Sequence, residues 1–244
     1  MKVLQGKVAV ITGAGRGIGK AIGIGFCRAG ASVVCAARTE REVLEAAMAM
    51  KLAGGDAVGR MTDVTYPDSV NSLFEFAHST FGGVDIVVAN AGINMPKATV
   101  EESDREQWKA VMETNLFGAY YTAKAAVPYL RARGGGHIIM VGSGLGHRGL
   151  PERSAYAVSK AGLWMLTRVL AQEVAADQIN VNELIPGPAQ TAMASTSSGE
   201  MKEDYGQHER RKKPEDVVPL AVFLASQPPG GPTCQSFSLM RREG

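Results

Sequence analysis

The sequence predicts an α/β fold, a doubly wound three-layer α/β/α sandwich built on one parallel sheet of about seven strands. Short Val/Ile/Ala-rich runs alternate with longer helical patterns, which implies parallel strands joined by crossover helices. Runs such as Lys-Val-Ala-Val-Ile are apolar throughout, as expected for strands covered on both faces. With 244 residues, 45% of them apolar, the chain can bury one large core, so we expect a single domain over residues 1–244.

The expected elements follow in chain order. Strands are expected over residues 8–11, 32–36, 57–61, 85–89, 137–141, 179–184 and 236–240. Two long helices are expected over residues 104–133 and 154–176. Pro128 lies within the last two turns of the first, where it should kink the helix or end its regular part.

Both long helices carry small and apolar residues on more than one face. The residues concerned are Ala119, Ala123, Ala126, Ala161 and Leu163. Surplus apolar surface on outer helices favours packing between subunits. Deeper burial of the same residues within one subunit is the alternative.

Composition excludes several classes of function. Lys plus Arg number 26 against 24 for Asp plus Glu, and this balance gives no nucleic-acid footprint. Three cysteines without metal-ligand spacing fit a reducing compartment better than a disulfide framework. No apolar run reaches membrane-spanning length, so we expect a cytoplasmic protein with no membrane, nucleic-acid or metal partner.

A glycine-rich segment, Thr12-Gly13-Ala14-Gly15-Arg16-Gly17-Ile18-Gly19, follows the first expected strand and opens a helical pattern. In this position, backbone amides and a helix N-terminus can receive a pyrophosphate. The spacing is G-x-x-x-G-x-G, with Gly13, Gly17 and Gly19 as its fixed points. A merely tight turn is the structural alternative.

Tyr156 and Lys160 lie four residues apart in the second long helix, which places them on one face. Tyrosine has a pKa of about 10 and is a poor base near neutrality. A permanent positive charge beside it favours the phenolate, as a general acid or base at physiological pH requires. Ser143 precedes this pair by thirteen positions.

The chain resembles a classical short-chain dehydrogenase/reductase over essentially its full length. The marks of that family appear in order as the Thr12 to Gly19 motif, Asp63-Val64, Asn90-Ala91-Gly92, Asn115, Ser143, Tyr156-x-x-x-Lys160, Pro186-Gly187 and Thr191. The resemblance implies a Rossmann-like fold, a nicotinamide cofactor, a small ketone or secondary-alcohol substrate, and a homotetramer, or a dimer, formed through the two long helices.

The resemblance also implies roles for these residues. Cofactor contacts are expected from Gly13, Gly15, Arg16, Gly17, Ile18, Gly19, Arg38, Asp63, Val64, Asn90, Ala91, Gly92, Pro186, Gly187 and Thr191, together with the catalytic pair. Tyr156 is expected to exchange a proton with the substrate oxygen, and Ser143 to orient that oxygen. Lys160 is expected to bind the nicotinamide ribose, and Asn115 to hold a water that contacts Lys160.

The second expected strand ends in Ala37-Arg38, where NAD-specific sites usually carry Asp or Glu. Arg38 can grip a 2′-phosphate, and Arg16 can add a second charge. Glu40 and Glu42 are expected to lie too far along the chain to supply the missing acid. NADP(H) is therefore favoured over NAD(H), although stacking of Arg38 on adenine in an NAD enzyme stays open.

The substrate is less clearly indicated. In relatives, substrate contacts come from the segment after Ser143 and from a lid, here about residues 188–213. His147 and Arg148 in the first segment suit either a polar substrate group or an ordinary surface. The runner-up function, reduction of 3-oxoacyl groups on an acidic acyl carrier protein, is supported by the bases Arg131 and Arg133 and weakened by the acid Asp177.

Two further expectations concern departures from the family. Cys234 stands where relatives commonly have glycine, and a positive φ there would strain the turn. A fold of this kind can also lose activity and act as a sensor or scaffold that only binds NADP(H). The intact set of Asn115, Ser143, Tyr156 and Lys160 argues against that reading.

Overall fold

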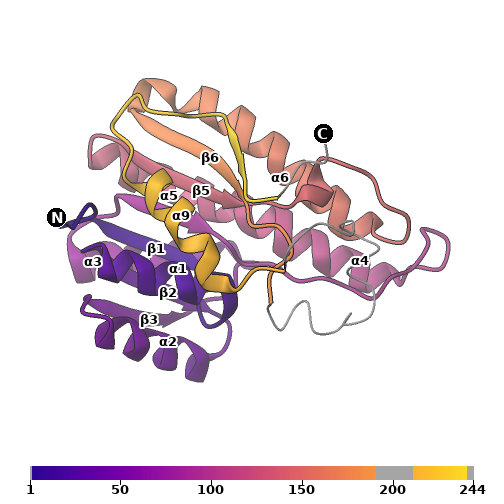
Figure 1. Cartoon of the computed structure of the whole chain (residues 1–244), viewed down its shortest axis with the longest axis horizontal. Helices are drawn as coiled ribbons and strands as arrows, with labels where there is room; N and C mark the ends of the chain where they lie inside the picture. The colour runs from indigo at the N-terminus through magenta and orange to yellow at the C-terminus, as the bar shows by residue number, and fades with distance from the viewer. Residues whose placement is uncertain (1, 191–210, 241–244) are drawn as a thin grey trace.

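In the computed structural model, which describes residues 2–190 and 211–240, seven strands form one parallel sheet in the order β3-β2-β1-β4-β5-β6-β7 (Figure 1). The strands are β1 Val8–Thr12, β2 Ser32–Ala37, β3 Ala57–Met61, β4 Ile86–Ala89, β5 Gly136–Val141, β6 Ile179–Ile185 and β7 Ser236–Ser238. These bounds confirm all seven expected strands, with differences of one or two residues at some ends. The central strands are buried along their length, as their continuous apolar runs predict.

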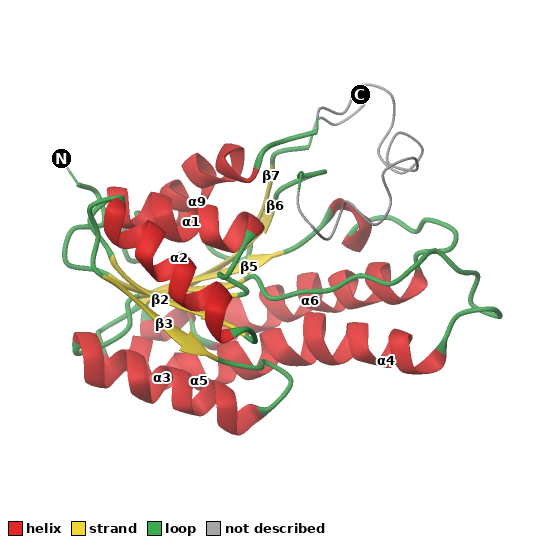
Figure 2. Cartoon of the chain, turned by 90° about the horizontal axis from the view of Figure 1, so that it is seen from below, coloured by secondary structure: helices red, strands yellow, loops and turns green. Residues whose placement is uncertain are grey.

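Helices cover both faces of the sheet, which confirms the doubly wound sandwich (Figure 2). On one face lie α1 Gly17–Arg28, α2 Glu40–Leu52 and α9 Val218–Ala225, the last preceded by a short 3₁₀ turn η4 Pro214–Val217. Their apolar residues share a core with one side of the strands, in which Phe26 and Met50 are fully buried.

The other face carries α3 Pro67–Phe81, α4 Arg105–Met112, α5 Gly118–Ala132 and α6 Ser154–Glu173. This layer encloses a second core around Phe74, Leu130 and Ile138. A short 3₁₀ turn, η3 Ala175–Asp177, follows α6, and the left-handed Gln178 (φ 58°) then leads into β6.

The first long helix is confirmed but is not uniform. Asp104 caps its start, where Oδ1 accepts from the N–H of Gln107 at 2.7 Å. A π-helical turn, η1 Glu113–Phe117, joins α4 to α5. Helix α5 runs through Pro128 and ends about one turn later, at Ala132, so its regular part ends near the proline. Ala126 and Leu130 on either side of Pro128 are fully buried, and that burial offsets the missing N–H donor.

Four of the five apolar residues cited for subunit packing follow the alternative of deeper burial, whereas Ala161 is half-buried. Ala119, Ala123, Ala126 and Leu163 are buried in the core of this chain, since they face the sheet. The apolar side chains that these helices expose are others, namely Phe117, Tyr120, Val158, Met165 and Val169.

Cys234 has a φ of 61°, in the left-handed region. The strain expected from a non-glycine residue is therefore present, at about 1 kcal/mol or more. Its side chain is half-buried, and Sγ lies 3.8 Å from the carbonyl oxygen of Arg168 in α6. The turn before β7 thus keeps its shape and packs a thiol against the second core.

None of the described helices is both long enough and apolar enough to cross a lipid bilayer.

Candidate active site

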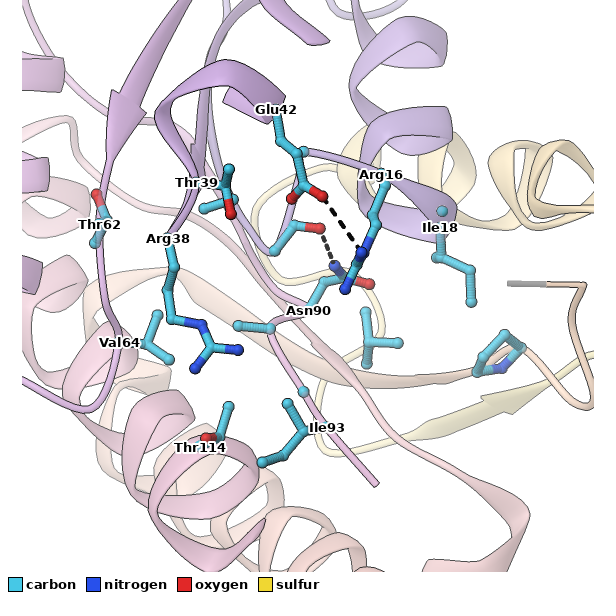
Figure 3. Close-up of a pocket in the computed structure, with 18 of the residues that line it drawn as sticks. Arg16, Ile18, Arg38, Thr39, Glu42, Thr62, Val64, Asn90, Ile93 and Thr114 are labelled. Atoms are coloured by element: carbon cyan, nitrogen blue, oxygen red, sulfur yellow. Dashed lines mark hydrogen bonds and ion pairs between the residues drawn. The ribbon is translucent and has the colours of Figure 1, made fainter. Parts of the chain in front are cut away.

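A pocket lies at the carboxyl ends of the neighbouring strands β1 and β4. The chain crosses from one side of the sheet to the other at this point, and doubly wound folds bind ligands in such places. The expected site residues that line it are Gly13, Gly15, Arg16, Gly17, Ile18, Arg38, Val64, Asn90, Ala91, Gly92, Tyr156, Lys160 and Pro186. Figure 3 shows several of their side chains around the open space.

The glycine segment leaves room that a side chain would fill. A Cβ on Gly13, whose φ is +63°, would lie 2.8 Å from the Cα of Ala91, and one on Gly19 would lie 2.5 Å from Asn90 Nδ2. Asn90 itself holds the loop, because Nδ2 donates to the carbonyl oxygens of Thr12 at 2.9 Å and Gly13 at 3.0 Å. The backbone is therefore fixed close to the ends of β1 and β4.

The N-terminus of α1 opens into the same pocket. Arg16 precedes the helix without a side-chain cap, and the first turn carries no acidic residue. Its backbone amides and the positive end of the helix dipole are thus available to an anion. Together with the space left by Gly13 and Gly19, this arrangement fits the pyrophosphate of a dinucleotide.

Tyr156 and Lys160 enter the pocket from α6, as their spacing predicts. Lys160 Nζ lies 5.9 Å from the centre of the Tyr156 ring and donates to the carbonyl oxygen of Val141 at 2.8 Å. The lysine is only 5% exposed. The structure therefore places a buried amine beside a half-buried phenol.

The charge on Lys160 is not permanent, which corrects the interpretation drawn from the sequence. Burial lowers its pKa from 10.5 to about 8, and the negative charge of Glu183 opposes that fall. The ammonium form therefore predominates at neutral pH and gives way to the free amine in mildly alkaline solution.

Ser143 follows β5 and begins a tight turn that packs against α6. It is buried, and its Oγ accepts from the N–H of Leu145 at 3.2 Å, capping the 3₁₀ turn η2 Gly144–Gly146. A Cβ on Gly146 would lie 2.8 Å from the backbone of Lys160. The turn after Ser143 is thus held directly against the helix that carries the pair.

Asn115 lies in the π-helical turn η1 and is 1% exposed. Its amide forms three direct hydrogen bonds. Nδ2 donates to the Ile93 carbonyl at 3.0 Å and to Ser159 Oγ at 3.1 Å, and Oδ1 accepts from the N–H of Ile93 at 2.8 Å. Ser159 Oγ in turn donates to the carbonyl of Tyr156 at 2.8 Å. Asn115 therefore ties the loop after β4 to α6.

Glu42, expected to lie too far along the chain to supply the missing acid, does line the pocket. The first turn of α2 folds back over the glycine loop, so that a Cβ on Gly15 would lie 2.8 Å from Glu42 Cβ. Glu42 Oε1 lies 3.3 Å from Arg16 NH1, and both side chains line the pocket (Figure 3). Arg38 extends into the pocket apart from this pair, towards Val64 and Thr114.

Some expected contacts are not in the pocket lining. Asp63 Oδ1 instead accepts from the N–H of Thr65 at 3.0 Å and its hydroxyl at 2.8 Å. Gly19 and Gly187 also lie outside the lining, as do Asn115 and Ser143. Thr191 falls outside the residues that the structure describes.

Other lining residues were not identified from the sequence. They are Ala37, Thr39, Glu42, Thr62, Ile93, Thr114, Val141 and Gly142. Thr39 and Glu42 closely follow Arg38 at the start of the next helix, so their position in the sequence could have predicted that they line the pocket. Ile93 and Thr114 had a similar signal, since they adjoin the expected residues Gly92 and Asn115.

Three basic residues expected to contact a substrate or a carrier protein form contacts within the chain. His147 and Arg148 are both exposed, and His147 Nε2 lies 2.8 Å from the buried Glu183 Oε2. Arg131 pairs with Asp177 through two hydrogen bonds of 2.9 and 2.7 Å. Arg133 bonds to Asp85 at 3.2 and 3.3 Å. These arginine charges are thus largely balanced within the chain.

Comparison with known proteins agrees with this geometry. Residues 7–202 match the short chain dehydrogenase family. The chain is 36% identical to a short-chain type dehydrogenase/reductase of Picea abies, over 91% of this chain and 87% of the other. It is 38% identical to the cis-4-hydroxycyclohexanecarboxylate dehydrogenase of Sinomonas cyclohexanicum, over 90% and 89%.

A crystal structure of a short-chain type dehydrogenase/reductase from Mycobacterium marinum superimposes with a TM-score of 0.89 at 33% identity, covering 96% of this chain and 94% of that one. Members of the family use NAD(P)(H). With its sheet order, glycine loop and Tyr156/Lys160 pair, the chain belongs to the short-chain dehydrogenase/reductase family and is an oxidoreductase acting on CH–OH groups.

Proposed function

We propose that this protein is a ketone reductase or secondary-alcohol dehydrogenase that uses NAD(P)(H), with NADP(H) favoured and Tyr156 as its general acid or base. One observation carries the proposal: the phenol of Tyr156 and the buried amine of Lys160 line the same pocket as the glycine loop. A dinucleotide held by that loop would supply or accept the hydride. The chain has to bind it, orient the substrate and move one proton.

Each group of residues has a share in that work. The glycine loop and the N-terminus of α1 bind the pyrophosphate. Lys160 in its ammonium form favours ionisation of the neighbouring phenol, and it would bind the nicotinamide ribose of a bound cofactor. Tyr156 gives its proton to a carbonyl oxygen in reduction and takes a proton from the alcohol in oxidation. Ser143 hydrogen-bonds that oxygen, and Asn115 positions Tyr156 through Ser159.

The test is the variant Tyr156→Phe, assayed by NADPH oxidation with a panel of cyclic and open-chain ketones. We expect turnover to fall by roughly a hundredfold or more while NADPH binding, followed by fluorescence, is retained. Tyr66→Phe is the matched control, since Tyr66 is 65% exposed and outside the pocket lining. Unchanged turnover in Tyr156→Phe would rule out the mechanism, and a wild type that binds NADPH but reduces nothing would favour the sensor alternative.

The preference for NADP(H) rests on charge. Arg38 and Arg16 bring two guanidinium groups to the pocket against one carboxylate, Glu42. A 2′-phosphate would therefore meet a net positive environment, although Glu42 makes it less positive than the sequence suggested. A kcat/KM for NADH equal to or above that for NADPH would contradict the preference.

The substrate class is a small ketone or secondary alcohol. The cis-4-hydroxycyclohexanecarboxylate dehydrogenase among the relatives makes ring-substituted secondary alcohols a sensible part of the panel. The acyl-carrier alternative is less supported, because Arg131 and Arg133 both pair with carboxylates of the chain. Equal kcat/KM for a 3-oxoacyl group on its carrier protein and on a short thiol would count against that alternative.

We also propose that residues 1–244 form one cytoplasmic domain with a lid at residues 188–213. Hydrogen bonds between Gln190 and Lys212 (2.8 Å) and between Lys212 and Pro188 (2.8 Å) join the described ends of that segment. The reducing compartment is proposed from the three cysteines, which are free thiols.

A homotetramer, or a dimer, would cover the apolar side chains exposed on α5 and α6. Met165 and Val169 are 48% and 43% exposed on α6. Light scattering on Met165→Glu should show smaller particles than the wild type. A wild type that is already monomeric would contradict this assembly.

A further inference from the structure

Glu183 is a fully buried acid in the middle of β6. It is 0% exposed and lies in a strand paired on both sides, with β5 and β7. A carboxylate in such a place is costly unless it is hydrogen-bonded or paired with a charge. The proposed reaction assigns it no part.

The carboxylate has partners on one side only. Oε2 accepts from Ser236 Oγ in β7 at 2.6 Å and lies 2.8 Å from His147 Nε2. Oε1 has no hydrogen-bond partner among the described residues. A Cβ at Gly142 would overlap Oε1, so only glycine fits there. The unpartnered oxygen therefore lies against the residue immediately before Ser143.

Lys160 meets the same short stretch of backbone. Its Nζ donates to the carbonyl oxygen of Val141, next to Gly142. A buried amine and a buried carboxylate thus lie against consecutive residues at the end of β5. The two groups also interact electrostatically, since the negative charge of Glu183 opposes the fall in the pKa of Lys160.

His147 links the acid to the turn that carries Ser143. Ser143 Oγ caps the start of η2, and His147 ends it, with its ring 5.2 Å from that of Trp164 in α6. Glu183 holds the far end of this turn through His147. Both ends of the segment are therefore fixed, one by a cap and the other by a buried carboxylate.

We propose that Glu183 is a positioning residue of the active site, which fixes the Ser143 turn through His147 and provides the buried negative charge that keeps Lys160 protonated. Among the described residues, the other titratable groups in contact with this pair are Tyr156 on α6 and His147 after η2. Strand β5 contributes only the backbone carbonyl of Val141, which accepts from Lys160. Strand β7 contributes the hydroxyl of Ser236, which donates to Glu183. The functional consequence rests on the function proposed above, whereas the effect on Lys160 does not.

The test is Glu183→Gln, which keeps the shape and a hydrogen-bonding carbonyl but removes the charge. The readout is acetylation of Lys160 by acetic anhydride against pH, followed by peptide mass spectrometry without cofactor or substrate. Only the free amine reacts, so the midpoint reports its protonation. We expect the midpoint to fall by about one pH unit and the rate at pH 7 to rise about fivefold.

Asp177→Asn is the matched control, because it removes an acid that lies on the surface and is paired with Arg131. Its midpoint should equal that of the wild type. In Glu183→Gln, the alkaline limb of the kcat/KM profile should move to lower pH, which a purely structural role would not cause. Because labelling needs no turnover, the effect on Lys160 is measurable even if the proposed reaction is wrong.

A second variant covers the case in which Glu183→Gln does not fold. His147→Leu removes one of the two groups that hold the carboxylate and frees the end of the Ser143 turn. We expect kcat to fall about tenfold with the Kd for NADPH unchanged, and His147→Gln to restore part of the loss. An unchanged midpoint in folded Glu183→Gln overturns the proposal, as does unchanged kcat in His147→Leu.

Discussion

Replacing Lys160 by methionine should make the protein more stable at neutral pH while abolishing its activity. Methionine keeps the length of the buried stem but carries no charge. In the folded protein the pKa of Lys160 falls from 10.5 to about 8, mainly because burial penalises the ammonium. At about 1.4 kcal/mol for each pH unit, keeping the lysine charged in this place costs roughly 3 kcal/mol.

The net effect is smaller than this penalty. The variant loses the hydrogen bond from Nζ to the Val141 carbonyl, which is worth about 1 kcal/mol. A gain of roughly 2 kcal/mol remains, equivalent to about 4–8 °C in Tm for a chain of this size. The comparison is made by urea and thermal unfolding at pH 7 in the absence of cofactor.

The pH dependence makes this prediction specific. Because the folded-state pKa lies below the unfolded value, the penalty is fully present below about pH 8 and disappears as the pH approaches 10.5. The wild type should therefore gain stability relative to Lys160→Met between pH 8 and 10. Lys51→Met, at an exposed position in the last turn of α2, is the control and should show no such trend. A Lys160→Met protein less stable than the wild type at pH 7, or a difference that does not vary with pH, would refute the reasoning.

Three further predictions address other parts of the structure. Glu42→Gln releases Arg16 from its ion pair, so the Kd for 2′,5′-ADP should fall severalfold while the Kd for 5′-AMP stays the same. Calorimetry that shows equal changes for both ligands would contradict a role of this pair at the 2′-phosphate. At Cys234, whose φ is 61°, valine should lower Tm by several degrees because a branched side chain is strained there, whereas glycine should not lower it; the reverse order in a thermal melt would contradict the strain. Asn115→Ala removes three hydrogen bonds of a buried amide and should destabilise the fold by roughly 2–4 kcal/mol in urea unfolding. A loss below about 0.5 kcal/mol would show that the amide does not hold the loop after β4 to α6.

The fold was predictable because the strands in the interior of the sheet have continuous apolar sequences. Strands β1 and β4 have no exposed face, so every position favours an apolar residue. The glycine loop was predictable for a related reason. A Cβ on Gly13 or Gly19 would collide with Asn90 or Ala91, just after β4. Such positions require glycine, which is visible in the sequence.

The features that sequence reasoning missed depend on contacts between distant segments. Nothing local in Glu113–Phe117 marks a π-helical turn, which accompanies the bonds of Asn115 to Ile93 and Ser159. Glu42 was dismissed by its distance along the chain, although a helix that starts just after β2 can fold its first turn back over the glycine loop. Glu183 carried a signal that was not used, since an acid within a buried strand needs a partner from elsewhere.

The electrostatics of the site now follow from its two buried charges. Lys160 has to be charged to favour ionisation of Tyr156, yet the dry surroundings that strengthen this interaction also lower the lysine's own pKa. Without a negative charge nearby, the Lys160 ammonium would therefore lose its proton beside Tyr156, where its charge is needed. Glu183 limits that loss from a position too deep for substrate to reach, with its own charge supported by Ser236 and His147. Glu183 in β6 thus allows Lys160 to be buried and still largely charged. The remaining cost of that buried charge lowers the stability of the fold, and it follows from the site's need for an ammonium beside Tyr156.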